Sequence, residues 1–175
     1  MSSPQSSAEN SANFLKTTSN LGSYGSKANV GLSRQERQWM KRIQEALSFD
    51  LLNSKYRKLV SPLAHFVTGH CSVATEAAYY LFAKDAGFKP QMKKIGNITH
   101  WWLFHPEREV ILDVTAPQVD PNFDYKTSRR SQSFQGHGTP SIRALHLMVR
   151  VQLMSCKKCK AFLEKTLHQA KNISN

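Results

Sequence analysis

The segment from Gly69 to Gly87 constrains the fold of this chain more than any other. It is rich in alanine, and its apolar residues recur at helical spacing. Thr68 and Gly69 open the segment, and Gly87 closes it as a C-cap. The sequence therefore predicts a buried central helix with Cys71 in its first turn. The apolar positions of this helix are Val73, Ala74, Ala77, Ala78, Leu81 and Phe82.

Three strand-like runs follow the predicted helix, at residues 89–95, 99–105 and 110–114. The last two are separated by residues 106–109, which have the composition of a hairpin turn. This order predicts an α+β fold, in which the central helix that carries Cys71 packs on a small antiparallel sheet.

Capping signals predict further helices on both sides of this unit. Ser33 and Glu36 form a capping box for a helix that we expect to end near residue 48. A second short helix is expected within 51–59. The segment 140–167, which begins with Pro and Ser, is expected to form a final helix or pair of helices.

The length of 175 residues allows one domain with a core, together with a tail. Residues 1–32 are rich in Ser, Asn, Gly and Ala and are predicted to be a disordered or extended arm. Residues 33–175 are predicted to be a single domain with basic C-terminal helices and a long loop at 116–139. The sequence contains no run of about 18 apolar residues, and we expect neither a secretory leader nor a disulfide framework. We therefore expect a cytoplasmic protein without a membrane partner.

Three chemistry-bearing residues fall on these elements in an order that indicates a cysteine nucleophile. Cys71 begins the predicted helix, His100 lies on the second strand and Asp113 ends the third. An imidazole that takes the thiol proton, together with a helix N-terminus, activates a thiol. A carboxylate on the far imidazole nitrogen fixes the tautomer. Each residue alone is more typical of a core position, and their combination indicates a catalytic triad.

Other parts of such a site have several candidates. The backbone N–H of Cys71 is the expected first donor to an oxyanion. His65 or His70 is a candidate for the second donor, although His70 is also expected to pack beside the nucleophile. Glu76 either supports the triad or has a solvated or capping role. Trp102 alternates with its neighbour across the strand, so that one of the two fills the core and the other is a candidate roof of the cleft.

The formal net charge of +12 is concentrated in two segments. Residues 126–175 contain ten Lys or Arg against one acid, and residues 34–58 contain seven against three. A field of this sign attracts polyanions, so nucleic acid is a candidate partner. A solvated basic surface explains the charge equally well. The candidate nucleic-acid contacts are Arg129, Arg130, Arg143, Arg150, Lys157, Lys158 and Lys160.

Cys156 and Cys159 form a Cys-x-x-Cys pair inside the last predicted helical region. The pair is compatible with half of a zinc site that His146 or His168 would complete. A redox pair is a second interpretation, but redox motifs normally stand at a helix start. Two structural cysteines on one helical face are the interpretation that we favour, and we expect no metal.

The residues around the trio resemble the transglutaminase-like branch of the papain-like cysteine enzyme superfamily. A more specific likeness is to small uncharacterised phage proteins of this type, and it covers roughly residues 65–150. Val114 stands where that family usually has proline. The residues that carry the likeness are Gly69-His70-Cys71-Ser72-Val73-Ala74-Thr75-Glu76-Ala77, Thr99-His100-Trp101-Trp102, Leu112-Asp113-Val114-Thr115-Ala116 and Pro140-Ser141-Ile142-Arg143-Ala144.

The resemblance implies a papain-like fold of transglutaminase type, with Cys71 as nucleophile, His100 as general base and acid, and Asp113 as the residue that orients His100. The expected function is that of a phage-encoded cysteine hydrolase or acyltransferase (amidase, deamidase, peptidase or transglutaminase-type). It would act on a protein or a small amide or ester without a cofactor. Two alternatives stay open: an inert papain-like scaffold that binds nucleic acid or belongs to the virion, and an inhibitor of a host protein.

Overall fold

The structure is a computed structural model that describes residues 28–59, 67–96, 98–130, 134 and 138–156. Its helices are α2 (Arg34–Ala46), α3 (Ser54–Leu59), α4 (Cys71–Ala78) and α5 (Ile142–Ser155). A π-helical turn, Tyr79–Ala83, continues α4 directly, and Phe49–Leu51 and Ala116–Gln118 form short 3₁₀ helices.

The strands β1 (Lys89–Ile95), β2 (Ile98–His105), β3 (Val110–Leu112) and β4 (Arg129–Arg130) form one antiparallel sheet in the order β3-β2-β1-β4. The α+β prediction is therefore confirmed. The prediction of a plain loop over residues 116–139 is wrong, because this segment contains a 3₁₀ helix and β4. The two residues of β4 pair with the free edge of β1, a long-range contact that the local sequence does not signal.

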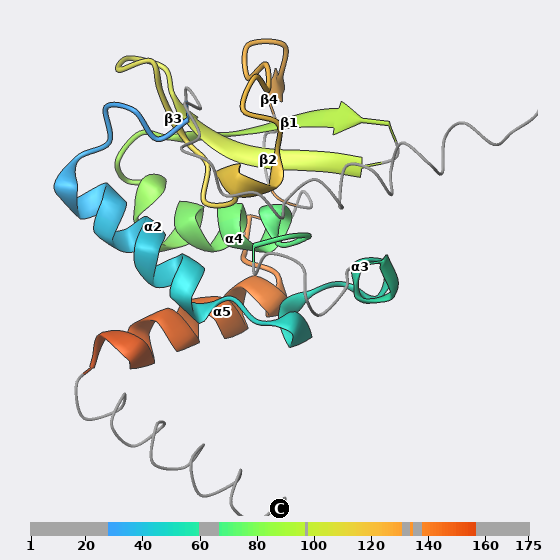
Figure 1. The fold of residues 1–175 in the computed structure, drawn as a ribbon. Coiled ribbons are helices and arrows are strands. Elements are labelled where there is room, and N and C mark those ends of the chain that lie inside the picture. The colour runs from blue at the N-terminus through green and yellow to red at the C-terminus, as the bar shows by residue number, and fades with distance from the viewer. Residues whose placement is uncertain (1–27, 60–66, 97, 131–133, 135–137, 157–175) are drawn as a thin grey trace, which may run out of the picture.

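The predicted central helix lies between two layers. In Figure 1 the sheet covers one side of α4, and α2 and α5 cover the other. Every residue of α4 except Ser72 is buried, as its alanine-rich sequence requires. The Thr75 hydroxyl fastens the helix to the sheet by donating to the Trp101 carbonyl at 3.0 Å. Cys71, the first residue of α4, therefore lies on a helix that is covered from both sides.

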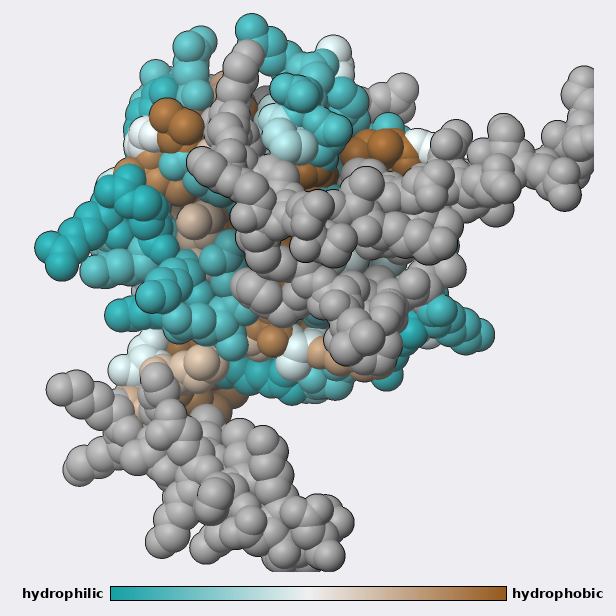
Figure 2. All heavy atoms as spheres, in the orientation of Figure 1, coloured by the Kyte–Doolittle hydropathy of each residue, from teal (hydrophilic) through white to brown (hydrophobic). Residues whose placement is uncertain are grey.

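Side-chain caps define where the flanking helices begin. Ser33 and Glu36 form the predicted capping box at the start of α2. Ser141 caps α5 by accepting from the Ala144 backbone N–H. The outward side of α2 is hydrophilic (Figure 2). The apolar residues of α2 pack with those of α4 and α5. The expected continuation of helix beyond residue 156 lies outside the described residues.

Two apolar clusters hold the layers together on opposite sides of the sheet. The larger cluster joins α2, α4 and α5 to the sheet and includes Ile43, Ala77, Leu103 and Leu147. The smaller cluster lies under the 116–126 segment and consists of Ala28, Trp102, Val119 and Tyr125, with Ile111, Ala116 and Phe123 packed against it. This smaller cluster surrounds one side of His100, so it also shapes the candidate site.

Residues 28–32, which the sequence analysis assigned to the arm, pack against the core. Ala28 and Leu32 are buried, and the Asn29 backbone N–H donates to the Ile111 carbonyl at 2.8 Å. The rest of the predicted arm, residues 1–27, lies outside the described residues. Within the described part of the chain, no helix is both long enough and apolar enough to cross a membrane.

Candidate active site

Cys71 is the first residue of α4, and it is buried. Gly69, in the preceding turn, has φ +78°, a left-handed conformation that glycine adopts without strain. A Cβ at Gly69 would also lie 3.0 Å from Leu52 Cδ2, so this turn has no room for a side chain. The local sequence thus brings the chain into α4 with Cys71 at the helix N-terminus, where the backbone N–H groups favour negative charge.

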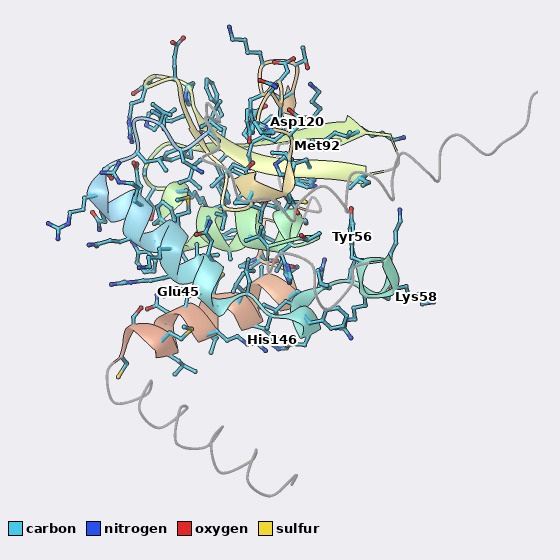
Figure 3. All side chains as sticks on the ribbon, viewed as in Figure 1. Glu45, Tyr56, Lys58, Met92, Asp120 and His146 are labelled. Atoms are coloured by element: carbon cyan, nitrogen blue, oxygen red, sulfur yellow. The ribbon has the colours of Figure 1, made fainter. Side chains whose placement is uncertain are left out.

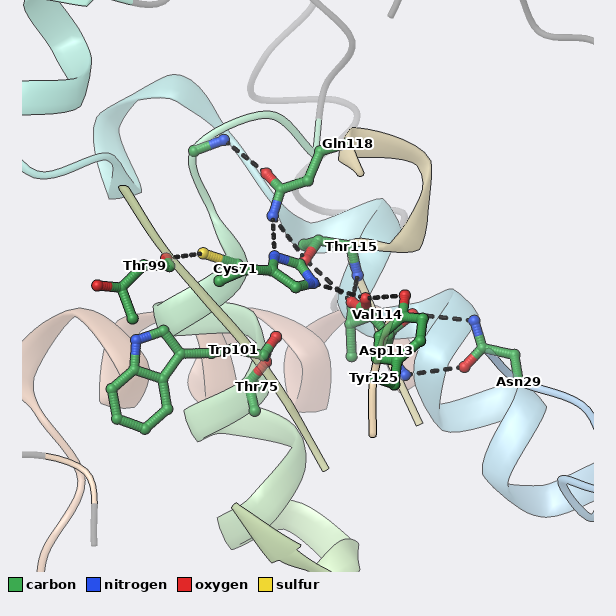
Figure 4. A network of polar contacts seen from close by, with 12 residues as sticks. Asn29, Cys71, Thr75, Thr99, Trp101, Asp113, Val114, Thr115, Gln118 and Tyr125 are labelled. Carbon is green, nitrogen blue, oxygen red and sulfur yellow. Dashed lines mark hydrogen bonds and ion pairs between the residues drawn. The ribbon is translucent and has the colours of Figure 1, made fainter. Parts of the chain in front are cut away.

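His100 and Asp113 form a buried pair at the centre of the site (Figure 4). The distance between His100 Nε2 and Asp113 Oδ2 is 2.7 Å, and the two side chains are 1% and 0% exposed. The remaining lone pairs of Asp113 accept from the Thr115 backbone N–H at 2.9 Å, the Thr115 hydroxyl at 3.2 Å and the Tyr125 hydroxyl at 2.8 Å. These donors, together with His100, satisfy both oxygens of the buried carboxylate.

The backbone of Asp113 is fixed by Asn29. The Asn29 side-chain amide donates to the Asp113 carbonyl and accepts from the Asp113 N–H, both at 2.9 Å. Asn29 therefore continues the pairing of β3 beyond Leu112, where the strand ends. This contact explains why residues 28–32 belong to the core although the sequence indicates no secondary structure there.

The environment of His100 controls its protonation. Burial lowers the pKa of His100, but the Asp113 carboxylate outweighs burial and raises this pKa above its usual value. The neighbouring Cys71 side chain acts on the pKa of His100 in the same direction. Because Asp113 holds Nε2, the ring nitrogen left for exchange with the thiol is Nδ1. The fold thus brings Cys71, His100 and Asp113 together. The two ring nitrogens of His100 have different partners and therefore different roles.

Aromatic side chains hold the imidazole ring in place. Trp102 stacks on His100 with ring centroids 5.8 Å apart, and Phe123 meets the ring edge to face at 5.3 Å. Trp102 is 1% exposed, so it fills the smaller apolar cluster rather than roofing a cleft. Its neighbour Trp101 lies on the other face of β2 and packs on Phe134.

The space beside the thiol is small. Tyr56, Ile98, His100 and Gln118 help to line a cavity of about 10 Å³ next to Cys71, room for about one water molecule. Tyr56 projects from α3 (Figure 3), and burial raises its pKa to about 12, so its hydroxyl stays neutral. The described side chains therefore leave little free space beside the thiol.

The sequence analysis missed Gln118. Its Nε2 lies 3.0 Å from His100 Nδ1, and its Oε1 accepts from the Gly69 backbone N–H at 2.9 Å. One signal was present, because Pro117 favours the start of a helical turn after Thr115, and residues three apart in a 3₁₀ helix share a face. Gln118 and Thr115 accordingly lie together, with Gln118 Nε2 donating to the Thr115 hydroxyl at 3.0 Å.

Two other predicted site residues have structural partners. His70 Nε2 donates to the Ser48 carbonyl at 2.9 Å, and burial lowers the pKa of His70. Glu76 accepts from the Ser141 backbone N–H at 2.8 Å and from the Ser141 hydroxyl at 2.6 Å. His70 therefore anchors the turn before α4 and Glu76 caps α5. Neither side chain is directed at the reacting atoms, and His65 lies outside the described residues.

The basic residues proposed for nucleic acid are only partly described. Arg143 donates to the Leu51 carbonyl at 3.2 Å, and Arg150 pairs with Asp50 at 2.6 Å. The hydrogen bonds from Arg150 lower the pKa of Asp50 to about 2. Both arginines thus bind other parts of the chain. Arg129 and Arg130 contribute their backbones to β4, whereas Lys157, Lys158 and Lys160 lie outside the described residues.

Of the two cysteines in the Cys-x-x-Cys pair, the structure describes only Cys156. Cys156 is exposed at the C-cap of α5, and Cys159 and His168 lie beyond it. His146 lies on α5 (Figure 3). Among the described residues, no group of three or more His, Cys, Asp or Glu side chains is arranged to hold a metal ion. The zinc interpretation therefore has no support from the described part of the chain.

Comparisons with known proteins give no match to a protein-family model, a curated protein or a solved structure.

Proposed function

We propose that this protein is a cysteine-dependent acyl-transfer enzyme or hydrolase whose triad is Cys71, His100 and Asp113. The observation that carries the proposal is the buried His100–Asp113 hydrogen bond of 2.7 Å beside a thiol at a helix N-terminus. A carboxylate on Nε2 leaves Nδ1 as the base for the thiol and supports the positive charge that develops on the ring. The resemblance to papain-like enzymes of transglutaminase type is consistent with this arrangement, and we propose that fold for the core.

The reaction would begin when His100 Nδ1 takes the proton from Cys71 Sγ. The thiolate then attacks the carbonyl carbon of an amide, ester or thioester, and the carbonyl electrons move onto oxygen. As this tetrahedral intermediate collapses, His100 returns its proton to the leaving amine, alcohol or thiol, and a thioester to Cys71 remains. Water or an amine, deprotonated by His100, attacks the thioester, and the thiol regains its proton.

Backbone N–H groups before and at the start of α4 are the candidate oxyanion donors. The N–H of Cys71 lies in the first turn of α4, where backbone N–H groups have no partner within the helix. The N–H of Gly69 already donates to an amide oxygen, that of Gln118, at 2.9 Å. We propose these two groups as the oxyanion hole, in place of the side chain of His65 or His70.

The test is the rate of Cys71 alkylation by iodoacetamide as a function of pH, followed by mass spectrometry. Exposed Cys156 in the same chain serves as the internal reference. We expect Cys71 to react at neutral pH and His100→Ala to remove most of that reactivity, because the thiolate depends on the imidazole. The proposal is wrong if Cys71 in the folded protein reacts equally with and without His100.

A further inference from the structure

Gln118 occupies the site in a way that the triad does not require. Its side chain is buried, and all of its polar contacts are to the machinery around Cys71. Oε1 accepts from the Gly69 backbone N–H at 2.9 Å, and Nε2 lies 3.0 Å from both Thr115 Oγ1 and His100 Nδ1. Figure 4 shows this carboxamide between the turn before α4 and the imidazole.

The hydrogen-bond network fixes which way the carboxamide faces. The backbone N–H of Gly69 only donates, so it requires the oxygen of Gln118. The Thr115 hydroxyl gives its proton to Asp113 and therefore accepts from the Gln118 amide. The amide N–H of Gln118 then faces His100 Nδ1, and this contact is a hydrogen bond only when the ring is neutral with its proton on Nε2, so Gln118 opposes the second proton that Asp113 favours. Gln118 thus occupies the lone pair that must receive the thiol proton.

The remaining contacts are those of a resting site. Cys71 Sγ donates its proton to the Thr99 carbonyl at 3.4 Å, which a thiolate cannot do. A proton on His100 Nδ1 would face the amide N–H of Gln118, placing two donors against each other. Proton transfer from Cys71 to His100 and the Gln118 contact therefore exclude one another. While Gln118 stays in place, the cavity of about 10 Å³ beside the thiol has room for about one water molecule.

We propose that Gln118 is the gate of this site: its carboxamide closes the Cys71–His100 pair at rest, and an incoming acyl group displaces it. The displacement replaces one hydrogen bond with another of the same kind. The Gly69 N–H stops donating to the Gln118 carbonyl oxygen and donates to the substrate carbonyl oxygen instead. His100 Nδ1 is then free to accept the thiol proton. This inference rests on the proposed function, since a gate has meaning only if Cys71 reacts through His100.

The test compares Cys71 alkylation by iodoacetamide at neutral pH in the wild type, Gln118→Ala and Gln118→Asn. Alanine removes the amide, and asparagine is one methylene too short to reach both Gly69 and His100. We expect both variants to raise the alkylation rate by about tenfold, the effect of losing roughly one net hydrogen bond. The matched control is Gln91→Ala, because Gln91 is a similarly buried glutamine that contacts Ser128 on another part of the sheet.

The same series with and without His100→Ala separates the two proposals. Faster alkylation in either Gln118 variant that is lost with His100→Ala, and an unchanged rate in Gln91→Ala, supports the gate. A rate that depends on His100 but stays equal or falls in the folded Gln118 variants overturns the gate and leaves the triad standing. A rate that is independent of His100 in every folded variant overturns both. If Gln118→Ala does not fold, Gln118→Asn gives the decision.

Discussion

Asp113→Asn tests the proton arrangement of the site by changing one atom. The Thr115 backbone N–H donates to Asp113 Oδ1 and has no acceptor capacity, so the asparagine has to keep its carbonyl oxygen on that side. Its NH₂ group then replaces Oδ2 and faces His100 Nε2, where the distance is now 2.7 Å. To avoid two opposed donors there, His100 has to carry its proton on Nδ1, and the Gln118 amide then has to move away from Nδ1. Nδ1 then no longer accepts the proton of Cys71.

The size of the effect follows from this change of tautomer. The same exchange in a serine protease triad lowers kcat by about 10⁴-fold, and we expect turnover here to fall by about 10³- to 10⁴-fold, or roughly 4 to 5.5 kcal/mol of barrier. Stability should change far less, by about 1 to 3 kcal/mol, because the Tyr125 hydroxyl can rotate to accept a hydrogen bond.

The assay combines Cys71 alkylation at neutral pH with denaturant unfolding of the same variant. Asp120→Asn is the matched control, because Asp120 is an exposed carboxylate a few residues along the same segment. We expect slow alkylation and a folded protein for Asp113→Asn and no change for the control. A folded Asp113→Asn protein whose Cys71 reacts as fast as in the wild type would refute the reasoning, since Nδ1 would then not be the base.

Two further predictions concern stability. Hydrogen bonds from Arg108 lower the pKa of Glu36 to about 2, so this ion pair stabilises the fold above pH 4.5 and loses its effect as the pH falls toward 2. Glu36→Gln should cost about 1 to 2 kcal/mol at neutral pH, measured by urea unfolding, and the gap from the wild type should close in acid. Gly69→Ala should cost about 1 to 3 kcal/mol in the same assay, because φ is +78° and Leu52 is 3.0 Å from the added Cβ. A Gly69→Ala protein as stable as the wild type would show that the turn can relax.

The parts of the site that the sequence predicted are those with local signals. Cys71 follows a turn glycine and begins an alanine-rich helix, and His100 and Asp113 lie on strand-like runs joined by a hairpin turn. The order of these elements along the chain already limits where the three side chains can meet. The capping role of Glu76 was one of two open interpretations, and the contact with Ser141 decides it.

The parts that the sequence did not predict depend on contacts between distant segments. Asn29 reaches Asp113 across 84 positions, and Gly69 meets Gln118 across 49. Neither Asn29 nor Gln118 lies in a periodic segment, and Pro117 signals the turn that contains Gln118 but not the distant partners of its side chain. The ion pair of Arg150 is also a contact between distant segments. The positive charge of Arg150 indicated a polyanion partner, but its side chain binds Asp50, which lies 100 positions away in the sequence.

The sequence by itself determined the central helix, the hairpin and the order in which Cys71, His100 and Asp113 appear, because helix caps, apolar periodicity and turn composition act over a few residues. Only the tertiary structure decided which nitrogen of His100 faces Asp113 and that Gln118 covers the other. Those facts follow from the satisfaction of buried donors and acceptors. That requirement can be met only after segments far apart in the chain have been packed together.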